Sequence, residues 1–251
     1  MATDSNISFG SLLTKEMVNV YVGPKGKCYY IHRGLLRSAS DFFRCHFTKR
    51  QSPGADPEED CTLADVNPAS FELFITWLYQ RTVATIPRHP LARDSAGRVL
   101  LDSDSEDDKQ QLEDNNGSSG PYYALYFLSE KWCIPQLKNM VMDWIRDYNK
   151  ATGAVCTASQ IEAIYKRTPA KSPLRQYAVE QFLFLNSLQP AEDPSLDFKE
   201  CLKVKADSFL LDVFKAVRGT KRNSLPYIDP DNKSRCTFHD HEQDGGKKCS
   251  G

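Results

Sequence analysis

Four side chains of the kinds that bind zinc lie close together in the segment CTFHDHEQDGGKKC. They are Cys236, His239, His241 and Cys249, and thiolates and imidazoles are the ligands that Zn²⁺ takes most often in proteins. Their spacing, Cys-x2-His-x-His-x7-Cys, departs from that of common zinc fingers, and few apolar residues surround them. Two interpretations therefore stay open: a metal site, and a polar tail without fixed structure, which is the simpler of the two.

A second group of reactive side chains surrounds the stretch YYIHRGLLRSASDFFRCHF, with His32 between Cys28 and Cys45. A catalytic histidine needs a nucleophile to activate or a carboxylate to orient it. The sequence places neither beside His32 at a spacing that can be interpreted. We predict that His32 ends a strand and that its ring satisfies backbone groups at the turn into the next helix. No catalytic residue is assigned, and we expect no enzymatic activity.

Two further patterns resemble ligand sites but fail in detail. In GPKGKC only two residues separate Gly23 from Gly26, Cys28 stands where a phosphate loop has a hydroxyl residue, and a strand follows. The acidic run within 101–108 lacks the glycine and the terminal glutamate of a calcium loop. We therefore expect no cofactor and no small-molecule substrate.

The composition narrows the class of protein. The 251 residues carry a formal net charge of −1, which argues against nucleic-acid binding because such proteins usually have a basic excess. The apolar stretches are too short for a membrane span, and no secretory signal is evident. The eight cysteines are scattered singly, so we expect most to be reduced and buried. An intracellular protein of the cytoplasm or nucleus is predicted.

The pattern of apolar residues predicts an α+β fold. Alternation predicts a strand over 17–23. A turn over 23–27 then predicts a second strand over 28–31, and 61–66 resembles a short third strand. A helix over 35–47 is interrupted at Ser38 or Ser40, and Asn67-Pro68 begins a helix that ends near Tyr79. Further helices are predicted over 122–132, 134–148, 157–167, 172–185 and 205–219, the last with Leu210, Val213, Phe214 and Val217 in register.

Changes of composition along the chain suggest its boundaries. Residues 1–15 form an N-terminal tail, and residues 16–150 form one domain that contains an acidic low-complexity insertion over about 84–120, which cannot bury enough apolar surface to fold alone. A helical extension follows over 151–219. Residues 220–251 are predicted to be a flexible polar tail.

The order of these elements resembles that of a BTB/POZ domain. The family pattern has a strand ending in histidine, a helix with paired leucines, and Ser-x-Phe-Phe. Asp-x-x-Pro-x-x-Phe then leads a helix ending Trp-Leu-Tyr, and Leu-Tyr-x-Leu-x-x-Lys-Trp and Ile-Pro-x-Leu follow. The match spans about Met17 to Tyr148. The residues that carry it are His32, Leu35, Leu36, Ser40, Phe42, Phe43, Asp65, Pro68, Phe71, Trp77, Leu78, Tyr79, Leu125, Tyr126, Leu128, Lys131, Trp132, Ile134, Pro135 and Leu137.

The resemblance implies a small three-stranded sheet capped by a helical cluster, here followed by a C-terminal helical extension. The sequence most resembles the single-domain BTB proteins of filamentous fungi. Family members bind proteins, form homodimers or hetero-oligomers, and in some cases bind a cullin so as to present substrates to a ubiquitin ligase. The sequence departs from the pattern in its short N-terminal segment, where many dimeric members exchange a long helix, and in the insertion after Val83.

The leading hypothesis is thus a protein–protein interaction module. It has a self-associating surface on the BTB core, a second surface on the helices from Thr157 to Gly219, and an adaptor role toward a cullin. The cullin-binding face is expected around Ser40–Phe47 and Tyr122–Tyr148, with Phe47 exposed on it. The alternative is a transcriptional or chromatin-associated regulator whose tail from Thr220 binds zinc or nucleic acid.

Overall fold

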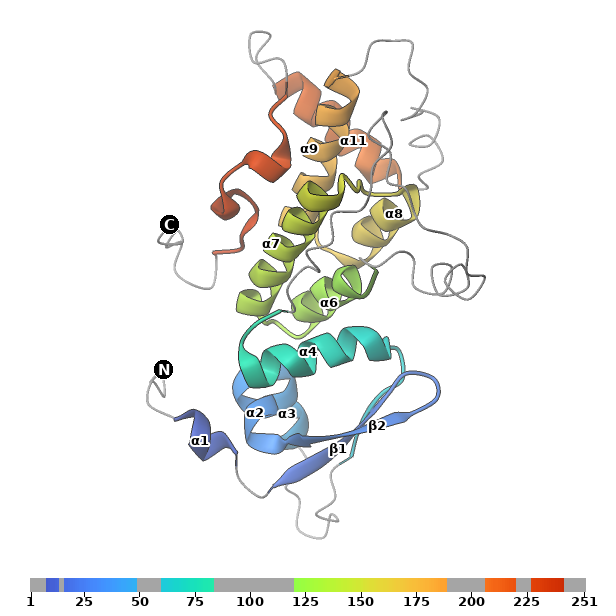
Figure 1. Ribbon diagram of the computed structural model, residues 1–251. Helices are drawn as coiled ribbons and strands as arrows, with labels where there is room; N and C mark the ends of the chain where they lie inside the picture. The colour runs from blue at the N-terminus through green and yellow to red at the C-terminus, as the bar shows by residue number, and fades with distance from the viewer. Residues whose placement is uncertain are drawn as a thin grey trace, which may run out of the picture. The chain divides into compact units, whose positions relative to one another are not determined.

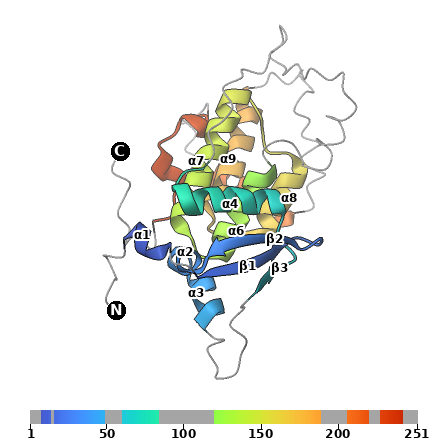
Figure 2. The same cartoon turned by 60° about the horizontal axis from the view of Figure 1, so that its bottom comes forward.

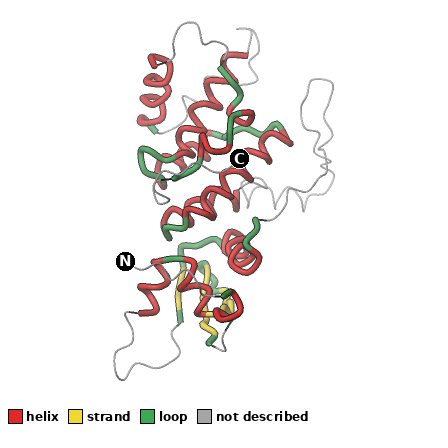
Figure 3. The backbone as a smooth tube through the Cα atoms, turned by 90° about the vertical axis from the view of Figure 1, so that its left-hand side faces the viewer, coloured by secondary structure: helices red, strands yellow, loops and turns green. Residues whose placement is uncertain are grey.

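The protein divides into two compact units. The computed structural model describes residues 8–13, 16–48, 60–83, 120–188, 206–219 and 227–241. The first unit comprises Met1–Thr85 and Leu112–Val141, and the second comprises Ile86–Gln111 and Met142–Gly251. Among the described residues, all strands belong to the first unit and the second is built from helices and loops (Figure 3).

The first unit contains a mixed three-stranded sheet. Strands β1 (Met17–Val22), β2 (Lys27–His32) and β3 (Cys61–Leu63) lie in the order β2-β1-β3, with β1 antiparallel to β2 and parallel to β3 (Figure 2). The alternation of β1 places Val18, Val20 and Val22 in the core. The third strand is shorter than the sequence predicts, because the residues after Leu63 turn toward the next helix.

The first unit also contains helices. They are α1 (Phe9–Leu12), α2 (Arg33–Ala39), α3 (Asp41–Thr48), α4 (Pro68–Gln80), α6 (Gly120–Lys131) and the beginning of α7 (Pro135–Thr152). Within this unit α2 contacts α3, α4 and β2, and α4 also contacts α6 (Figure 1). The short helix α1 lies within the segment predicted to be an N-terminal tail.

Two polar side chains set the starts of helices in the first unit. Ser40 ends α2, and its Oγ accepts a hydrogen bond from the backbone N–H of Phe42 at 3.1 Å and donates one to the carbonyl of Trp132 at 2.6 Å. Asn67 caps α4, since its Oδ1 accepts from the backbone N–H of Ala69 at 2.8 Å. The predicted break at Ser40 and the predicted cap at Asn67 are both present.

The core of the first unit is a cluster of aromatic rings. Trp132 has no exposed surface, and its ring centroid lies 5.0 Å from that of Phe43 and 5.0 Å from that of Phe74. Phe71 packs on Phe74 at 5.6 Å. Trp77 of α4 is also buried, and its ring centroid lies 6.0 Å from that of Phe74.

The second unit holds the remainder of α7, followed by α8 (Ala158–Arg167), α9 (Pro173–Leu188) and α11 (Asp207–Gly219). Thr157 and Gln160 form the predicted capping box at the start of α8. Phe209, the first buried residue of α11, packs on Tyr165 of α8 at 5.5 Å and on Phe182 of α9 at 5.6 Å between ring centroids.

The second unit also includes part of the segment predicted to be a flexible polar tail. Residues 227–241 form two 3₁₀-helices, η2 (Pro230–Asn232) and η3 (Arg235–Phe238), and η2 and η3 both contact α9. The side chain of Phe238 is buried and meets the ring of Tyr177 edge to face at 5.5 Å. One buried aromatic ring and several hydrogen bonds keep this segment packed on the helices of the second unit. Such contacts leave no helical period in the sequence, because a period arises only from a continuous apolar stripe.

The acidic insertion predicted over 84–120 lies outside the described residues except for Gly120, where α6 begins. No helix in the described part of the chain is long and apolar enough to cross a membrane.

Candidate functional site

A row of apolar side chains is exposed at the N-terminal edge of the first unit. Phe9, Leu13 and Met17 retain 44%, 39% and 44% of their surface. Phe9 belongs to α1, Leu13 is its C-cap and Met17 is the first residue of β1. Gly34, at the beginning of α2, lies against α1. A Cβ atom at Gly34 would lie 2.7 Å from the backbone oxygen of Leu12, so the close approach of α1 to α2 requires glycine there.

Helix α3 presents a different set of side chains from those expected. Phe47, which the sequence analysis placed on an exposed binding face, is fully buried and packs on Phe43. A charged residue at position 47 would therefore disrupt the core rather than a surface. The exposed positions of α3 include Arg44, whose guanidinium pairs with Asp41 at 2.8 Å, and Cys45.

His32 lies at the end of β2, as predicted, but its ring contacts a side chain rather than the backbone. Its Nδ1 is 2.8 Å from the hydroxyl oxygen of Tyr79 in α4, and the same hydroxyl accepts from the backbone N–H of His32 at 3.3 Å. The partner of the imidazole is thus a phenol that joins β2 to α4. This arrangement positions two elements of the core and supplies no oriented carboxylate of the kind found in a catalytic triad.

The glycine-rich turn that ends at Gly26 leads into strand β2 rather than into a helix. Gly23 and Gly26 both have positive φ, which suits glycine in a tight turn. Lys27, the residue that would face a phosphate, instead donates to Glu72 of α4 at 2.7 Å, and Tyr29 donates to the same oxygen at 2.9 Å. These contacts lower the pKa of Glu72 through the hydrogen bonds from Lys27 and Tyr29.

A comparison with protein families agrees with the fold of the first unit. Residues 9–93 match the model of the BTB/POZ domain. The chain carries a BTB/POZ domain. The match begins at α1 and includes the three strands and α4, but it stops before α6, whereas the resemblance in sequence extended to Tyr148. A comparison with curated proteins gave no match.

BTB domains mediate binding to protein partners and dimerisation, and they are not known as a class of enzymes. The BTB domain therefore makes this chain a protein–protein interaction module. The buried aromatic cluster and the His32–Tyr79 contact belong to its scaffold.

The second unit also has an exposed apolar surface, on α11. Leu211 and Phe214 retain 53% and 59% of their surface, and Leu210 and Val217 are exposed as well. The predicted apolar register of this helix is therefore largely on the outside, while Phe209 alone is buried in α11.

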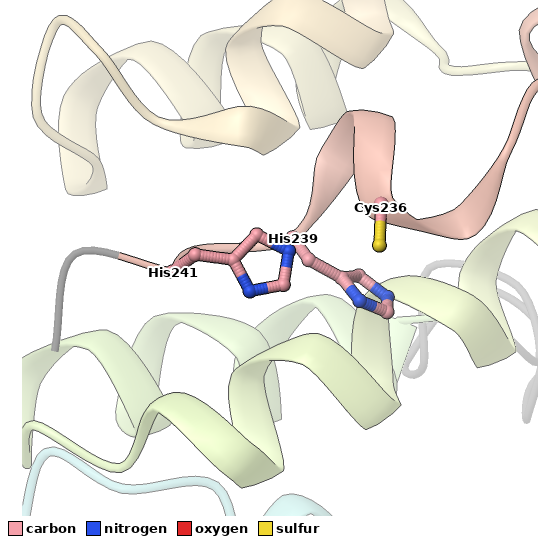
Figure 4. A group of neighbouring side chains, drawn as sticks. All are labelled: Cys236, His239 and His241. Carbon is pink, nitrogen blue, oxygen red and sulfur yellow. The ribbon is translucent and has the colours of Figure 1, made fainter. Parts of the chain in front are cut away.

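Three of the four predicted zinc-binding residues lie together in the second unit. One ligand atom from each of Cys236, His239 and His241 lies within 4.8 Å of the other two (Figure 4). Cys249 lies outside the described residues. The sequence analysis expected most cysteines to be buried, but of the six that the structure describes only Cys61 is. Cys236 and Cys156 are half-buried.

Sequence reasoning missed the residues of α7 that hold this cluster in place. Asp143 accepts from His239 and pairs with Arg235, and Asp147 pairs with Arg235 as well. Arg146, which lies between them in sequence, is buried and donates to backbone carbonyls of the C-terminal segment. The available signal was the pair of aspartates four residues apart, on one face of a helix.

Proposed function

We propose that this protein is an adaptor with two interaction surfaces. It self-associates through the N-terminal row of the BTB domain, and it holds a second protein on α11. The observation that carries this proposal is that each unit exposes a row of large apolar side chains, Phe9, Leu13 and Met17 in one and Leu210, Leu211, Phe214 and Val217 in the other. Exposed large apolar side chains that lie near one another in the chain favour sites where proteins associate.

The N-terminal row suits contact with a second copy of the chain. Dimers of identical chains form most often about a twofold axis, with the same patch on both subunits. Phe9, Leu13 and Met17 are exposed at the start of the family match, and a contact of this type would bury them. The four-residue helix α1 has no buried residue of its own, so a partner would supply burial that the single chain does not.

Self-association is tested by light scattering coupled to size-exclusion chromatography. We expect the wild-type chain to be a dimer and the double variant Phe9→Glu, Met17→Glu to be a monomer, because two carboxylates would be buried at the contact. Tyr30→Glu is the matched control, since Tyr30 is an exposed aromatic residue on β2, outside the row. A monomeric wild type, or a double variant that remains dimeric, would show that this surface is not a dimer contact.

The α11 face suits a partner that presents apolar side chains, such as one face of an amphipathic helix. Affinity purification of the tagged chain from its native cells, with identification of co-purifying proteins, tests this role. We expect Phe214→Glu to remove a specific set of proteins that Lys166→Glu, a change at an exposed position of α8, retains. If both variants recover the same proteins as the wild type, α11 does not bind a partner.

The finer proposal is that one partner is a cullin and that α3 contributes to its binding. What supports it is the BTB domain together with the exposed positions of α3. Arg44→Glu tests it without disturbing the core, because the Arg44–Asp41 pair is largely exposed and such pairs stabilise little. We expect Arg44→Glu to weaken binding to a purified cullin and Arg37→Glu, on the exposed part of α2, to leave it unchanged. Equal binding by both variants would exclude α3.

A further inference from the structure

The Cys236, His239 and His241 side chains converge because of the backbone between them. Cys236 lies in η3 and His239 is its C-cap, so the two are three residues apart, the separation at which side chains of a 3₁₀-helix eclipse. His239 has extended dihedrals, φ −96° and ψ 148°. Residues two apart in extended chain point to the same side, which brings His241 next to His239. The ring centroids of the two histidines are 5.9 Å apart.

A carboxylate orients one of these ligands. The Nε2 of His239 lies 2.9 Å from Oδ1 of Asp143 in α7, and both side chains are largely buried. A carboxylate can only accept, so in the neutral imidazole Nε2 carries the hydrogen and Nδ1 is the nitrogen with a lone pair. This arrangement of carboxylate, histidine and metal is common in zinc proteins, where it fixes the ring and raises the basicity of the ligating nitrogen.

The segment around the three side chains is anchored independently of any metal. Arg235 pairs with Asp143 at 3.2 Å and with Asp147 at 2.9 Å. Phe238, between Cys236 and His239, is buried against Tyr177 and lies beneath the guanidinium of Arg146 at 4.9 Å. The ligands are therefore held near one another before a metal binds, which lowers the conformational entropy that binding must overcome.

We propose that Cys236, His239 and His241 bind a zinc ion, with Asp143 as the residue that positions His239. A thiolate and two imidazoles suit zinc, whereas calcium and magnesium take oxygen ligands. Tetrahedral geometry at zinc–ligand bonds of about 2.0–2.3 Å requires ligand atoms roughly 3.3–3.8 Å apart. The three ligand atoms all lie within 4.8 Å of one another, so shifts of about 1 Å would bring them to this spacing. The site goes beyond the proposed adaptor function, and it joins the C-terminal segment to α7 within the second unit.

Metal analysis of the purified full-length chain is the first test. After removal of metal with a chelator, we expect titration to restore one equivalent of Zn²⁺ per chain. Co²⁺ in its place should give the charge-transfer band of a thiolate ligand. Cys236→Ser and His239→Gln should each lose stoichiometric binding and the zinc-dependent rise of the thermal midpoint. Cys133→Ser, which changes an exposed cysteine of the first unit, should keep both.

Two aspartates of α7 provide a matched pair for the positioning role. Both pair with Arg235, and Asp143 also lies 2.9 Å from Nε2 of His239. We expect Asp143→Asn to weaken zinc binding about tenfold to a hundredfold and Asp147→Asn to leave the affinity unchanged. Equal weakening by the two variants would mean that Asp143 acts only through Arg235, and the positioning role would be wrong.

The proposal is overturned if the wild-type chain takes up no stoichiometric zinc, or if Cys236→Ser and His239→Gln both retain it, since other groups would then be the ligands. A cobalt spectrum without the thiolate band would also exclude Cys236. Far-ultraviolet circular dichroism of each variant, compared with the metal-free wild type, distinguishes loss of a ligand from loss of the fold.

Discussion

The interiors of the two units are stabilised in different ways. The interior of the first is an aromatic cluster around Trp132, in which rings pack on rings. The interior of the second includes several hydrogen-bonded polar side chains, among them Arg146, Asn149 and Gln181, all buried. Apolar contacts are not directional, whereas buried polar groups must be satisfied by specific partners. The stability of the first unit therefore depends on the volume and shape of its buried rings. The stability of the second depends also on individual hydrogen bonds.

Tyr177 is the centre of the polar network in the second unit. Its hydroxyl accepts from Asn149 at 2.8 Å and from Gln181 at 3.1 Å, and it donates to Asp231 of η2 at 2.8 Å. Burial raises the pKa of Tyr177 well above its usual value, and nearby Asp231 adds to this effect. One phenol thereby connects α7, α9 and the C-terminal segment, so a substitution of Tyr177 would remove hydrogen bonds to all three.

The largest effect is expected from a cavity in the aromatic cluster. Phe74→Ala removes a fully buried ring that contacts Trp132, Phe71 and Trp77, and it should lower the free energy of unfolding by about 3–5 kcal/mol. Hydrogen exchange measured by mass spectrometry should show the loss of protection in peptides of the first unit. Tyr30→Ala, at an exposed position, should change stability by about 0.5 kcal/mol or less. If both units lose protection equally, they unfold as one cooperative body and the comparison fails.

The next effect tests the polar side of the comparison. Arg146 donates from Nη2 to the carbonyls of Pro230 at 2.9 Å and Lys233 at 2.6 Å. Arg146→Met keeps apolar volume but leaves these carbonyls without their donor, which should cost about 2–3 kcal/mol.

Hydrogen exchange measured by mass spectrometry tests Arg146→Met. Peptides from 227–241 should lose protection, and peptides of the first unit should not. Arg167→Met, at an exposed position of α8, is the control. Unchanged exchange in 227–241 would show that the C-terminal segment does not depend on this guanidinium.

The difference between the units also explains how far the sequence could predict the structure. In the first unit, alternation in β1, the Asn67 cap and the break at Ser40 are local signals, and each element formed where it was predicted. Local patterns suffice when burial is the only requirement, because an apolar period shows which face is inside. Phe47 is the exception, since its place at the end of α3 was read as exposed and it is buried.

In the second unit local sequence patterns predict less of the structure. The register of Leu210, Phe214 and Val217 indicates a helix, but periodicity cannot tell whether its apolar face meets the protein's own core or another molecule. The contacts of Arg146 and Tyr177 with the C-terminal segment join residues more than fifty positions apart in sequence. No local pattern encodes such contacts. The Cys and His residues were visible as candidates, but their convergence depends on η3 and α7.

A smaller effect comes from the helix caps, one in each unit. Asn67→Ala and Thr157→Ala each remove a side-chain acceptor from the first turn of a helix, and each should cost about 1 kcal/mol. Chemical denaturation of the two variants measures this directly. Because the caps are equivalent, similar losses would mean that the units differ in their interiors and not in their helix ends. A Thr157→Ala loss several times larger would contradict this.

The smallest effect is a pH dependence specific to the second unit. Burial raises the pKa of Asp231 to about 6, and Asp229 adds to the rise, while the hydrogen bond from Tyr177 and the charges of Arg146 and Lys150 oppose it. A carboxyl whose folded-state pKa lies above its unfolded value of about 4 binds its proton more tightly when folded. Its contribution to stability is therefore present below about pH 4 and is lost as the pH rises through about 6.

Asp231→Asn isolates this contribution, because the amide does not titrate and can still accept from Tyr177. The thermal midpoint of the wild type minus that of Asp231→Asn should fall as the pH is raised from about 4 to about 7. The change should be modest, because the carboxyl is only partly buried and solvent screens its charge. A difference that stays flat or rises over this range would mean that the network around Tyr177 accommodates a charged Asp231. Specific hydrogen bonds would then govern the second unit without the desolvation cost inferred here.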